Sequence, residues 1–336
     1  MAGYESLHNH TIDSDGTLTH LEVLKTAEKL GYGVIAFTDH DMVPTPEKIE
    51  QLRKDYAGPV KWTIGTELST GLPEEFGGVE RGMVHVLGLF IDPTNQALLD
   101  HFQKLEDSRI ERMKHMVKHL RGIGFKLTED DVLGVTEGNV ISSWHVVKAV
   151  QTHPENLELE KKLLEQMKEA AKTDAEMREK YETMVTAGVV QYPYRLYMKA
   201  SSFIPMPRAE TYNTLLSMDD SVKLIRDAGG VAVLAHWYFH TKFYKEAKLE
   251  ATVKAGLLDG LETATDNTTF DGNVDKEIEF LQELIKQNNL LETMGSDSHY
   301  IRDLEHFAKT PAAERSIGHT QKIIDRIKPN LEWSNF

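Results

Sequence analysis

Residues 4–40 read YESLHNHTIDSDGTLTHLEVLKTAEKLGYGVIAFTDH. Two short apolar runs flank a helical pattern here, which predicts a strand at Glu5–Leu7, a helix at Leu18–Leu30 and a strand at Val34–Phe37. Thr19 is a suitable N-cap for this helix, Glu22 stands at the spacing of a capping box, and Gly31 is a typical helix stop. Strand, helix and strand in this order predict one βα unit of a parallel sheet.

The same alternation continues along the chain. Further short apolar runs predict strands at Lys61–Ile64, Met83–Phe90, Val231–Ala235, Gly260–Leu261 and Leu290–Met294. Strands that alternate with helices are typical of an α/β protein, and we expect the strands to close into a barrel.

Between about Pro93 and Met218 the pattern changes, because long charged helical stretches replace the strands. Gln96–Gly122 and Leu157–Val185 carry apolar residues at three- and four-residue spacing among many Lys and Glu. We therefore predict a barrel formed by residues 1–92 and 218–336. Residues 93–217 are expected to form a mainly helical insertion.

The composition limits the chemistry. The 336 residues include no cysteine, so any metal must be held by nitrogen and oxygen atoms. A net charge of -15 makes extended nucleic acid an unfavourable partner. No apolar run approaches the roughly 20 residues of a membrane-spanning helix. The N-terminus enters the first predicted strand without the pattern of a secretory signal, so we expect a cytoplasmic protein.

Histidine and acidic residues gather near the ends of the predicted strands. In chain order they are His8-Asn9-His10, Asp15, Asp39-His40, Glu67, His85, His236 and Asp297-Ser298-His299. In barrels of this kind the carboxyl ends of the strands meet on one face, so residues far apart in sequence come together there. An isolated His-x-His pair or a single buried histidine is often incidental, but the joint pattern predicts one metal site.

The donor types indicate which metals bind. His8 and His10 are two residues apart at a strand end, so both imidazoles point to the same side and can reach one cation. Mixed imidazole and carboxylate ligands favour zinc, manganese or iron over calcium or magnesium. A carboxylate such as Glu67 can bridge two cations. Six histidines and three acids exceed the needs of one ion, so we expect two or three divalent ions.

The motifs resemble those of the PHP (polymerase and histidinol phosphatase) family of metal-dependent phosphoesterases. The matching segments are Leu7-His8-Asn9-His10 with Asp15, Phe37-Thr38-Asp39-His40, Gly65-Thr66-Glu67, Val84-His85, Leu234-Ala235-His236 and Gly295-Ser296-Asp297-Ser298-His299. They cover roughly residues 4–92 and 218–300. The resemblance implies a distorted (β/α)7 TIM-like barrel in place of an eight-stranded one.

The resemblance also implies how the ligands are shared. His8, His10, Glu67 and Asp297 would hold one ion, Asp15, His40 and His299 a second, and Glu67, His85 and His236 a third. The long insertion is similar to that of the subgroup containing nucleoside-bisphosphate phosphatases, in which the inserted segment covers the active site.

The substrate-binding segment departs from that subgroup. An Arg-Pro-His segment is expected within the insertion, and this chain has Ser142-Ser143-Trp144-His145 instead. His145 is kept as a candidate substrate-binding residue, but the arginine that could grip a phosphate in bidentate fashion is missing. Arg208 is the candidate replacement cation, with Lys199 and Arg302 as other possibilities.

Together these features predict an enzyme that hydrolyses a small phosphate ester by attack of a metal-bound hydroxide on phosphorus. A nucleotide or nucleoside bisphosphate is the favoured substrate. A sugar or histidinol phosphate, a cyclic phosphodiester and the end of a short oligonucleotide are alternatives. Readings of another class are an amidohydrolase, which also has an early His-x-His, and a non-catalytic metal-binding module. The general acid is not identified by the sequence.

Overall fold

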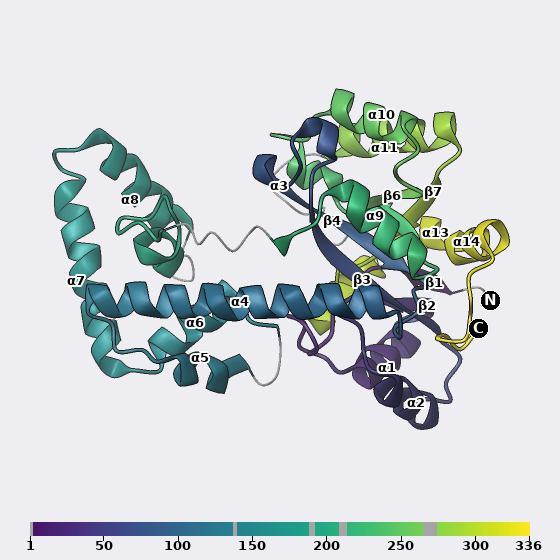
Figure 1. Cartoon of the computed structure of the whole chain (residues 1–336), viewed down its shortest axis with the longest axis horizontal. Helices are drawn as coiled ribbons and strands as arrows, with labels where there is room; N and C mark the ends of the chain where they lie inside the picture. The colour runs from purple at the N-terminus through teal and green to yellow at the C-terminus, as the bar shows by residue number, and fades with distance from the viewer. Residues whose placement is uncertain (1–2, 137–139, 188–191, 208–213, 265–273) are drawn as a thin grey trace. The chain divides into compact units, whose positions relative to one another are not determined.

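The computed structural model describes residues 3–136, 140–187, 192–207, 214–264 and 274–336. The chain divides into two compact units, one formed by Met1–Gln103 with Leu215–Phe336 and the other by Lys104–Thr214 (Figure 1). Each unit has its own buried apolar core.

The first unit is built on a seven-stranded sheet whose strands follow one another in chain order. The strands are β1 (Tyr4–Ser6), β2 (Tyr32–Phe37), β3 (Lys61–Gly71), β4 (Met83–Leu89), β5 (Val231–Leu234), β6 (Gly260–Ala264) and β7 (Leu291–Met294). Each corresponds to a strand predicted from the sequence. The α/β barrel class with a helical insertion is confirmed.

One strand differs from the expected parallel arrangement. The pairs β1–β2, β2–β3, β5–β6 and β6–β7 are parallel, whereas β4 is antiparallel to both β3 and β5. A parallel crossover needs a dozen or more residues, and only residues 72–82 separate β3 from β4. The short connection therefore returns the chain as a hairpin-like pair, and this is one source of the distortion of the barrel.

The sheet closes where the chain segments after β1 and β7 meet. Leu7 N–H donates to Met294 O at 3.0 Å, Asp297 N–H to His8 O at 2.9 Å, and His10 N–H to Ser298 O at 3.0 Å. Gly295 lies in this seam, where a Cβ would stand 2.5 Å from His8 Cβ and 2.7 Å from His8 N. The closure thus requires a residue without a side chain at position 295.

Burial alternates along the strands, as a barrel requires. Val34 and Ala36 of β2 face a small inner cluster with Leu7, whereas Ile35 and Phe37 pack outward against the helices. Both faces of the sheet are therefore covered, which explains why the strands read as continuous apolar runs.

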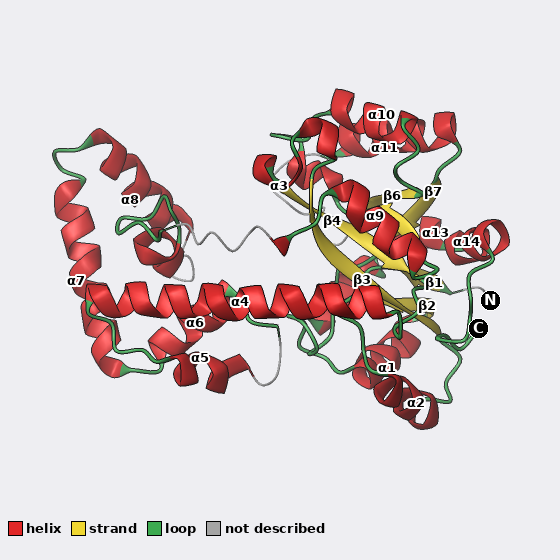
Figure 2. Ribbon diagram, in the orientation of Figure 1, coloured by secondary structure: helices red, strands yellow, loops and turns green. Residues whose placement is uncertain are grey.

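Helices cover the outside of this sheet (Figure 2). They are α1 (His20–Leu30), α2 (Pro46–Asp55), η1 (Glu74–Phe76), α3 (Gly78–Arg81), α9 (Met218–Asp227), η5 (Trp237–His240), α10 (Glu246–Lys254), α11 (Asp275–Asn288), α12 (Ile301–Phe307), α13 (Pro311–Ser316) and α14 (His319–Ile327). The capping box of Thr19 and Glu22 is present in α1, and Gly31 ends the helix with φ 85°. These local predictions are confirmed.

Helix α4 (Gln96–Ile123) follows the first half of the barrel, and the second unit is mainly helical. Its further elements are α5 (Glu129–Thr136), α6 (Ser143–Gln151), α7 (Pro154–Ala170), α8 (Ala175–Ala187) and the short π-helical segment η3 (Tyr194–Met198). The predicted helix at Leu157–Val185 is divided between α7 and α8, because Asp174 accepts from Glu176 N–H and Met177 N–H and so begins a new helix. No helix in the described part of the chain has the length and hydropathy to cross a membrane.

Candidate metal centre

The structure brings all nine predicted site residues together on one face of the barrel. His8, His10 and Asp15 follow β1, His40 follows β2, Glu67 lies in β3, His236 follows β5, and Asp297 and His299 follow β7. His85 is the exception, since it lies near the amino end of β4 and pairs in register with Ser69. Because β4 is antiparallel, its amino end lies at the same face as the carboxyl ends of the other strands.

Three groups of ligand atoms are each close enough to hold an ion. Their members are His10, Asp15, His40 and His299; His8, His10, Glu67 and Asp297; and His40, Glu67 and His85. In each group the atoms lie within 4.8 Å of one another. The described chain therefore places these donors in adjoining groups that share His10, His40 and Glu67.

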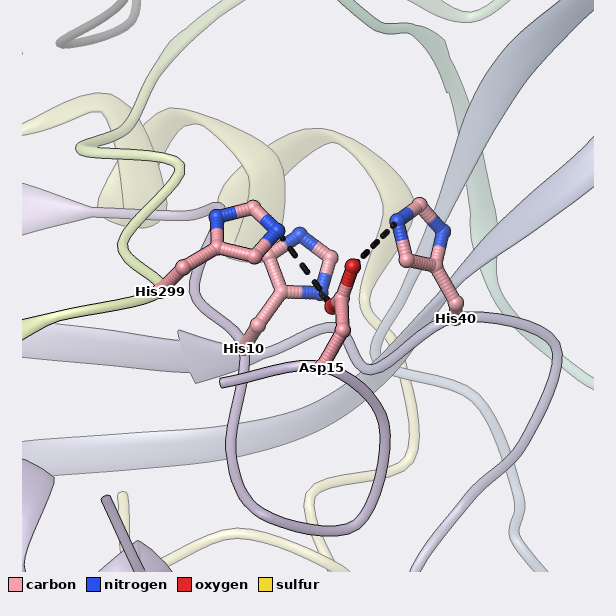
Figure 3. Close-up of side chains that lie close together, drawn as sticks. All are labelled: His10, Asp15, His40 and His299. Carbon is pink, nitrogen blue, oxygen red and sulfur yellow. Dashed lines mark ion pairs between the residues drawn. The ribbon is translucent and has the colours of Figure 1, made fainter. Parts of the chain in front are cut away.

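Asp15 joins the first group (Figure 3). Its Oδ1 lies 3.3 Å from His299 Nε2 and its Oδ2 lies 3.8 Å from His40 Nε2. The rings of His10 and His299 stack with centroids 4.3 Å apart. This group is the more accessible one, since Asp15 is about half exposed.

Glu67 lies at the centre of the other two groups. Its Oε2 is 3.2 Å from His8 Nε2, His10 Nε2 and His40 Nδ1, and its Oε1 is 2.9 Å from His85 Nδ1 and His236 Nε2. Both oxygens of one buried carboxylate thus face imidazoles from different strands. A bridging position between cations is compatible with this arrangement.

The electrostatics favour a cation at this place. Burial alone raises the pKa of Glu67, but the imidazoles of His40, His85 and His8 outweigh burial and hold this pKa well below its usual range. Burial lowers the pKa of His10, but its bonds to Asp297 and Glu67 outweigh burial and raise it to about 10. The carboxylates therefore stay ionised and draw positive charge into the site.

Pairs of imidazole nitrogens that face each other show that the donor set fits divalent ions. His8 Nε2 and His10 Nε2 face each other at 3.3 Å, and His85 Nδ1 and His236 Nε2 do so at 3.4 Å, all of them beside carboxylates. Ring nitrogens that converge in this way share one proton at a time or a common cation. Divalent ions can accept the lone pairs of several such nitrogens together, so the clusters support bound divalent metal.

Two of the candidate metal ligands have unfavourable backbone geometry. Asp297 has φ 47° and His236 has φ 28°, both in the left-handed region that costs non-glycine residues roughly 1–2 kcal/mol. Such strain at a functional site persists only where the surrounding contacts enforce it.

Asp39 is one of the acidic residues that follow a predicted strand, and the structure shows which groups it contacts. Asp39 Oδ1 accepts from Thr11 N–H at 2.7 Å and from Ser14 Oγ at 2.6 Å. It therefore fixes the loop that carries Asp15.

Two residues near the centre were not identified from the sequence. Glu262, in the middle of the short strand β6, contacts His8 Nδ1. His240, on η5, has its ring centroid 5.6 Å from that of His236, and burial together with His236 lowers the pKa of His240 to about 3. The only hint available was a carboxylate inside an apolar strand and a histidine four residues after His236.

The two predicted substrate-binding residues have different outcomes. His145 is buried at the start of α6, in the second unit, and its Nδ1 accepts from Ser142 N–H at 3.1 Å. Arg208 lies outside the described residues. Substrate binding by either residue stays a prediction.

Comparison with known proteins shows relatives that match nearly the whole chain or about a third of it. A 5'-3' exoribonuclease from Haemophilus influenzae is 23% identical over 331 residues, which is 98% of each chain. A 3',5'-nucleoside bisphosphate phosphatase from Chromobacterium violaceum is 32% identical over 118 residues, which is 35% of this chain and 38% of that protein. No family model matches the chain.

Solved structures share the fold. A protein described as a metal-dependent phosphoesterase from Bifidobacterium adolescentis aligns over 97% of both chains, with a TM-score of 0.64 and 23% identity. One described as an amidohydrolase from Chromobacterium violaceum aligns over 88% of both chains, with a TM-score of 0.61 and 23% identity. Together with the relatives in sequence, these matches agree with the resemblance that the histidine motifs indicated: the chain is similar in sequence to a nucleoside bisphosphate phosphatase and an exoribonuclease, and it shares the fold of a metal-dependent phosphoesterase.

Proposed function

We propose that this protein is a metal-dependent phosphoesterase that acts on a small phosphate ester, with a nucleotide or nucleoside bisphosphate as the favoured substrate. One observation carries the proposal: six imidazoles and three carboxylates from six strands converge on one face, with Glu67 contacted by five of the imidazoles. Such a set supports two or three ions, as in enzymes that hydrolyse phosphate esters.

We assign the ligands in three sets. His8, His10, Glu67 and Asp297 would hold one ion, Asp15, His40 and His299 would hold a second, and Glu67, His85 and His236 would hold a third. The contacts of Glu67 with His8 and His236 and of Asp15 with His299 support this division, although His40 also lies close to Glu67 and His85. Mixed nitrogen and oxygen donors favour manganese, zinc or iron. His10 belongs to the first set, and it also lies within 4.8 Å of the ligand atoms of the second. It would therefore lie beside both ions.

Bound divalent ions supply a water-derived nucleophile near neutral pH and offset the charge on the phosphoryl oxygens. The chain itself provides orientation. Asp39 holds the loop that presents Asp15, and the buried carboxylates of Glu67 and Asp297 lie where they would hold ions. The insertion at residues 93–217 is proposed to limit access to substrates of small size, and this part of the proposal stays a prediction.

The nucleotide preference rests on the relatives. One relative is named a 3',5'-nucleoside bisphosphate phosphatase and another, matched over nearly its full length, a 5'-3' exoribonuclease. The second name makes the 5' end of a short RNA a second candidate substrate. The net charge of -15 disfavours binding along an extended polynucleotide but not the entry of one terminal nucleotide.

The test is a panel of substrates given to manganese-loaded protein. It includes phosphate monoesters, nucleoside bisphosphates, cyclic diesters and a short 5'-phosphorylated RNA, with a His8→Ala/His10→Ala double variant as the control. Release of phosphate or nucleotide by the wild type and its loss in the control establish the phosphoesterase. No release of phosphate or nucleotide from any substrate by metal-loaded wild type would reject the proposal.

A further inference from the structure

Glu262 occupies a buried position directly behind the candidate metal centre. It lies in β6 and is 1% exposed. Its Oε1 and Oε2 lie 3.0 and 3.3 Å from His8 Nδ1, and its Oε2 accepts from His236 N–H at 3.0 Å. One carboxylate thus contacts two candidate ligands that belong to different strands.

The contact with His8 determines which ring nitrogen is free. A carboxylate accepts hydrogen bonds, so His8 carries a proton on Nδ1 toward Glu262. The opposite nitrogen, Nε2, then faces Glu67 Oε2 at 3.2 Å and Asp297 Oδ1 at 3.4 Å. Since both oxygens of Glu262 flank Nδ1, the ring is also held in one orientation.

The contact with His236 acts on the backbone. His236 has φ 28°, a conformation that is unfavourable for a residue with a side chain. Its N–H donates to Glu262, and in this conformation its Nε2 reaches Glu67 Oε1 at 2.9 Å. The hydrogen bond therefore offsets part of the strain that presents this imidazole to the site.

Glu262 is not itself placed as a ligand. It meets His8 at Nδ1, whereas the grouped ligand atoms gather around Nε2 on the other side of the ring, and Glu262 belongs to none of the ligand groups in the described chain. Burying a carboxylate is costly unless it is hydrogen-bonded. The contacts of Glu262 with His8 Nδ1 and His236 N–H offset this cost.

We propose that Glu262 is a positioning residue that sets the tautomer of His8 and the backbone of His236, and so raises the affinity of the site for divalent ions. The inference rests on the proposed metal centre. It goes beyond it in assigning a function to a residue outside the ligand set. Outer-shell carboxylates of this kind orient ligating histidines and increase their basicity.

The test compares Glu262→Gln with Glu292→Gln. Glu292 lies on the neighbouring strand β7 and contacts Thr263 Oγ1 at 2.8 Å, so its substitution changes the same chemical group on the same sheet. Binding of manganese to metal-free protein is measured by calorimetry. We expect Glu262→Gln to weaken binding about 10- to 100-fold, the usual effect of losing an outer-shell partner, and Glu292→Gln to bind as the wild type does.

A second readout reports the tautomer directly. In zinc-loaded protein, nitrogen-15 spectra of the histidine rings should show His8 protonated at Nδ1 in the wild type and altered in Glu262→Gln, because the amide can turn its NH2 group toward the ring. A purely structural role of Glu262 would shift the melting temperature but leave this signal unchanged.

The possible outcomes distinguish the role of Glu262 from the existence of the metal centre. Wild-type affinity and an unchanged His8 signal in a folded Glu262→Gln would overturn this inference and leave the metal centre standing. Absence of manganese binding by the wild type would overturn both. Should Glu262→Gln fail to fold, Glu262→Asp keeps the charge but is too short to reach both partners, and the proposal then requires weaker binding by that variant.

Discussion

Asp297 connects the end of the barrel to the centre of the site. Its Oδ1 lies 3.1 Å from His10 Nε2 and 3.4 Å from His8 Nε2, and the three side chains are buried. Burial raises the pKa of Asp297, but His8 and His10 outweigh burial and hold that pKa well below its usual range. The carboxylate is therefore charged and available to a cation at neutral pH.

Asp297→Asn keeps the shape of this side chain and removes its charge. Outer-shell partners of a metal ligand are commonly worth about 10- to 100-fold, and we expect the loss of a ligand to lower kcat by at least that factor. Metal content, measured by mass spectrometry on purified protein, should also fall. Asp325→Asn, on the exposed face of α14, is the control. Full turnover by Asp297→Asn would contradict the ligand assignment.

The pKa of His10 predicts how the metal-free protein responds to pH. Because its folded pKa is raised to about 10 from a usual value of about 6.5, protonated His10 stabilises the fold fully below pH 6.5. That stability is lost as pH rises toward 10. We expect the melting temperature of chelator-treated protein to fall between pH 7 and pH 9.

His10→Gln provides the matched comparison for this pH effect. It lacks the titrating group, so its melting temperature should change less over the same interval. Equal slopes for the wild type and the variant would show that His10 is not responsible.

At this scale the sequence predicts most of the site. His8, His10, Asp297 and His299 were recognisable because they form short motifs beside strand ends, where the barrel geometry brings them together. Glu262 was not, because its partner His8 is 254 positions away and no local spacing links the two. A residue that acts through a long-range contact leaves no local pattern.

Among the elements, the strands were predictable and the direction of one was not. The apolar run Met83–Leu89 indicates a strand in either direction, since period and composition do not depend on strand polarity. The connection from β3 is short, and this length decides the antiparallel pairing. His85 was therefore expected at the end of a strand, but it lies in the amino half of β4. It reaches the site because β4 runs antiparallel to the strands beside it.

The seam between the segments after β1 and β7 can be tested with Gly295→Ala. The added Cβ would meet backbone and Cβ atoms of His8 at 2.5–2.7 Å, and overpacking of this kind costs about 1–3 kcal/mol. We expect a lower free energy of unfolding in urea and weaker manganese binding, because His8 must move.

Gly122→Ala is the control for that substitution. Gly122 lies in α4, has no atom within 4 Å of an added Cβ, and should gain about 0.5–1 kcal/mol from replacement of glycine within a helix. Equal stability of the two variants would indicate that the seam tolerates a side chain.

For the molecule as a whole, the two compact units should respond differently to metal. The ligand groups belong to the unit formed by Met1–Gln103 and Leu215–Phe336, and the other unit has a separate core around Val146, Leu163 and Met167. An ion that binds only the folded state at 100 times its dissociation constant stabilises it by about 2.7 kcal/mol.

Hydrogen exchange with and without manganese measures this difference. Metal should slow exchange in the segments that follow β1, β2 and β7, while α7 and α8 of the second unit keep their rates. Chelator-treated protein supplies the reference state. Equal protection in both units would show that ion binding is coupled to the second core.

The seam joining the two ends of the barrel also has a consequence for biosynthesis. A ribosome delivers His8 and His10 well before Asp297 and His299, so a nascent chain carries only part of the candidate ligand set until β7 has been passed. A product that stops before β7 keeps Glu67 beside His10 but lacks Asp297, the other carboxylate that faces His10 Nε2. The complete set of candidate ligands therefore exists only in a chain whose synthesis has passed His299.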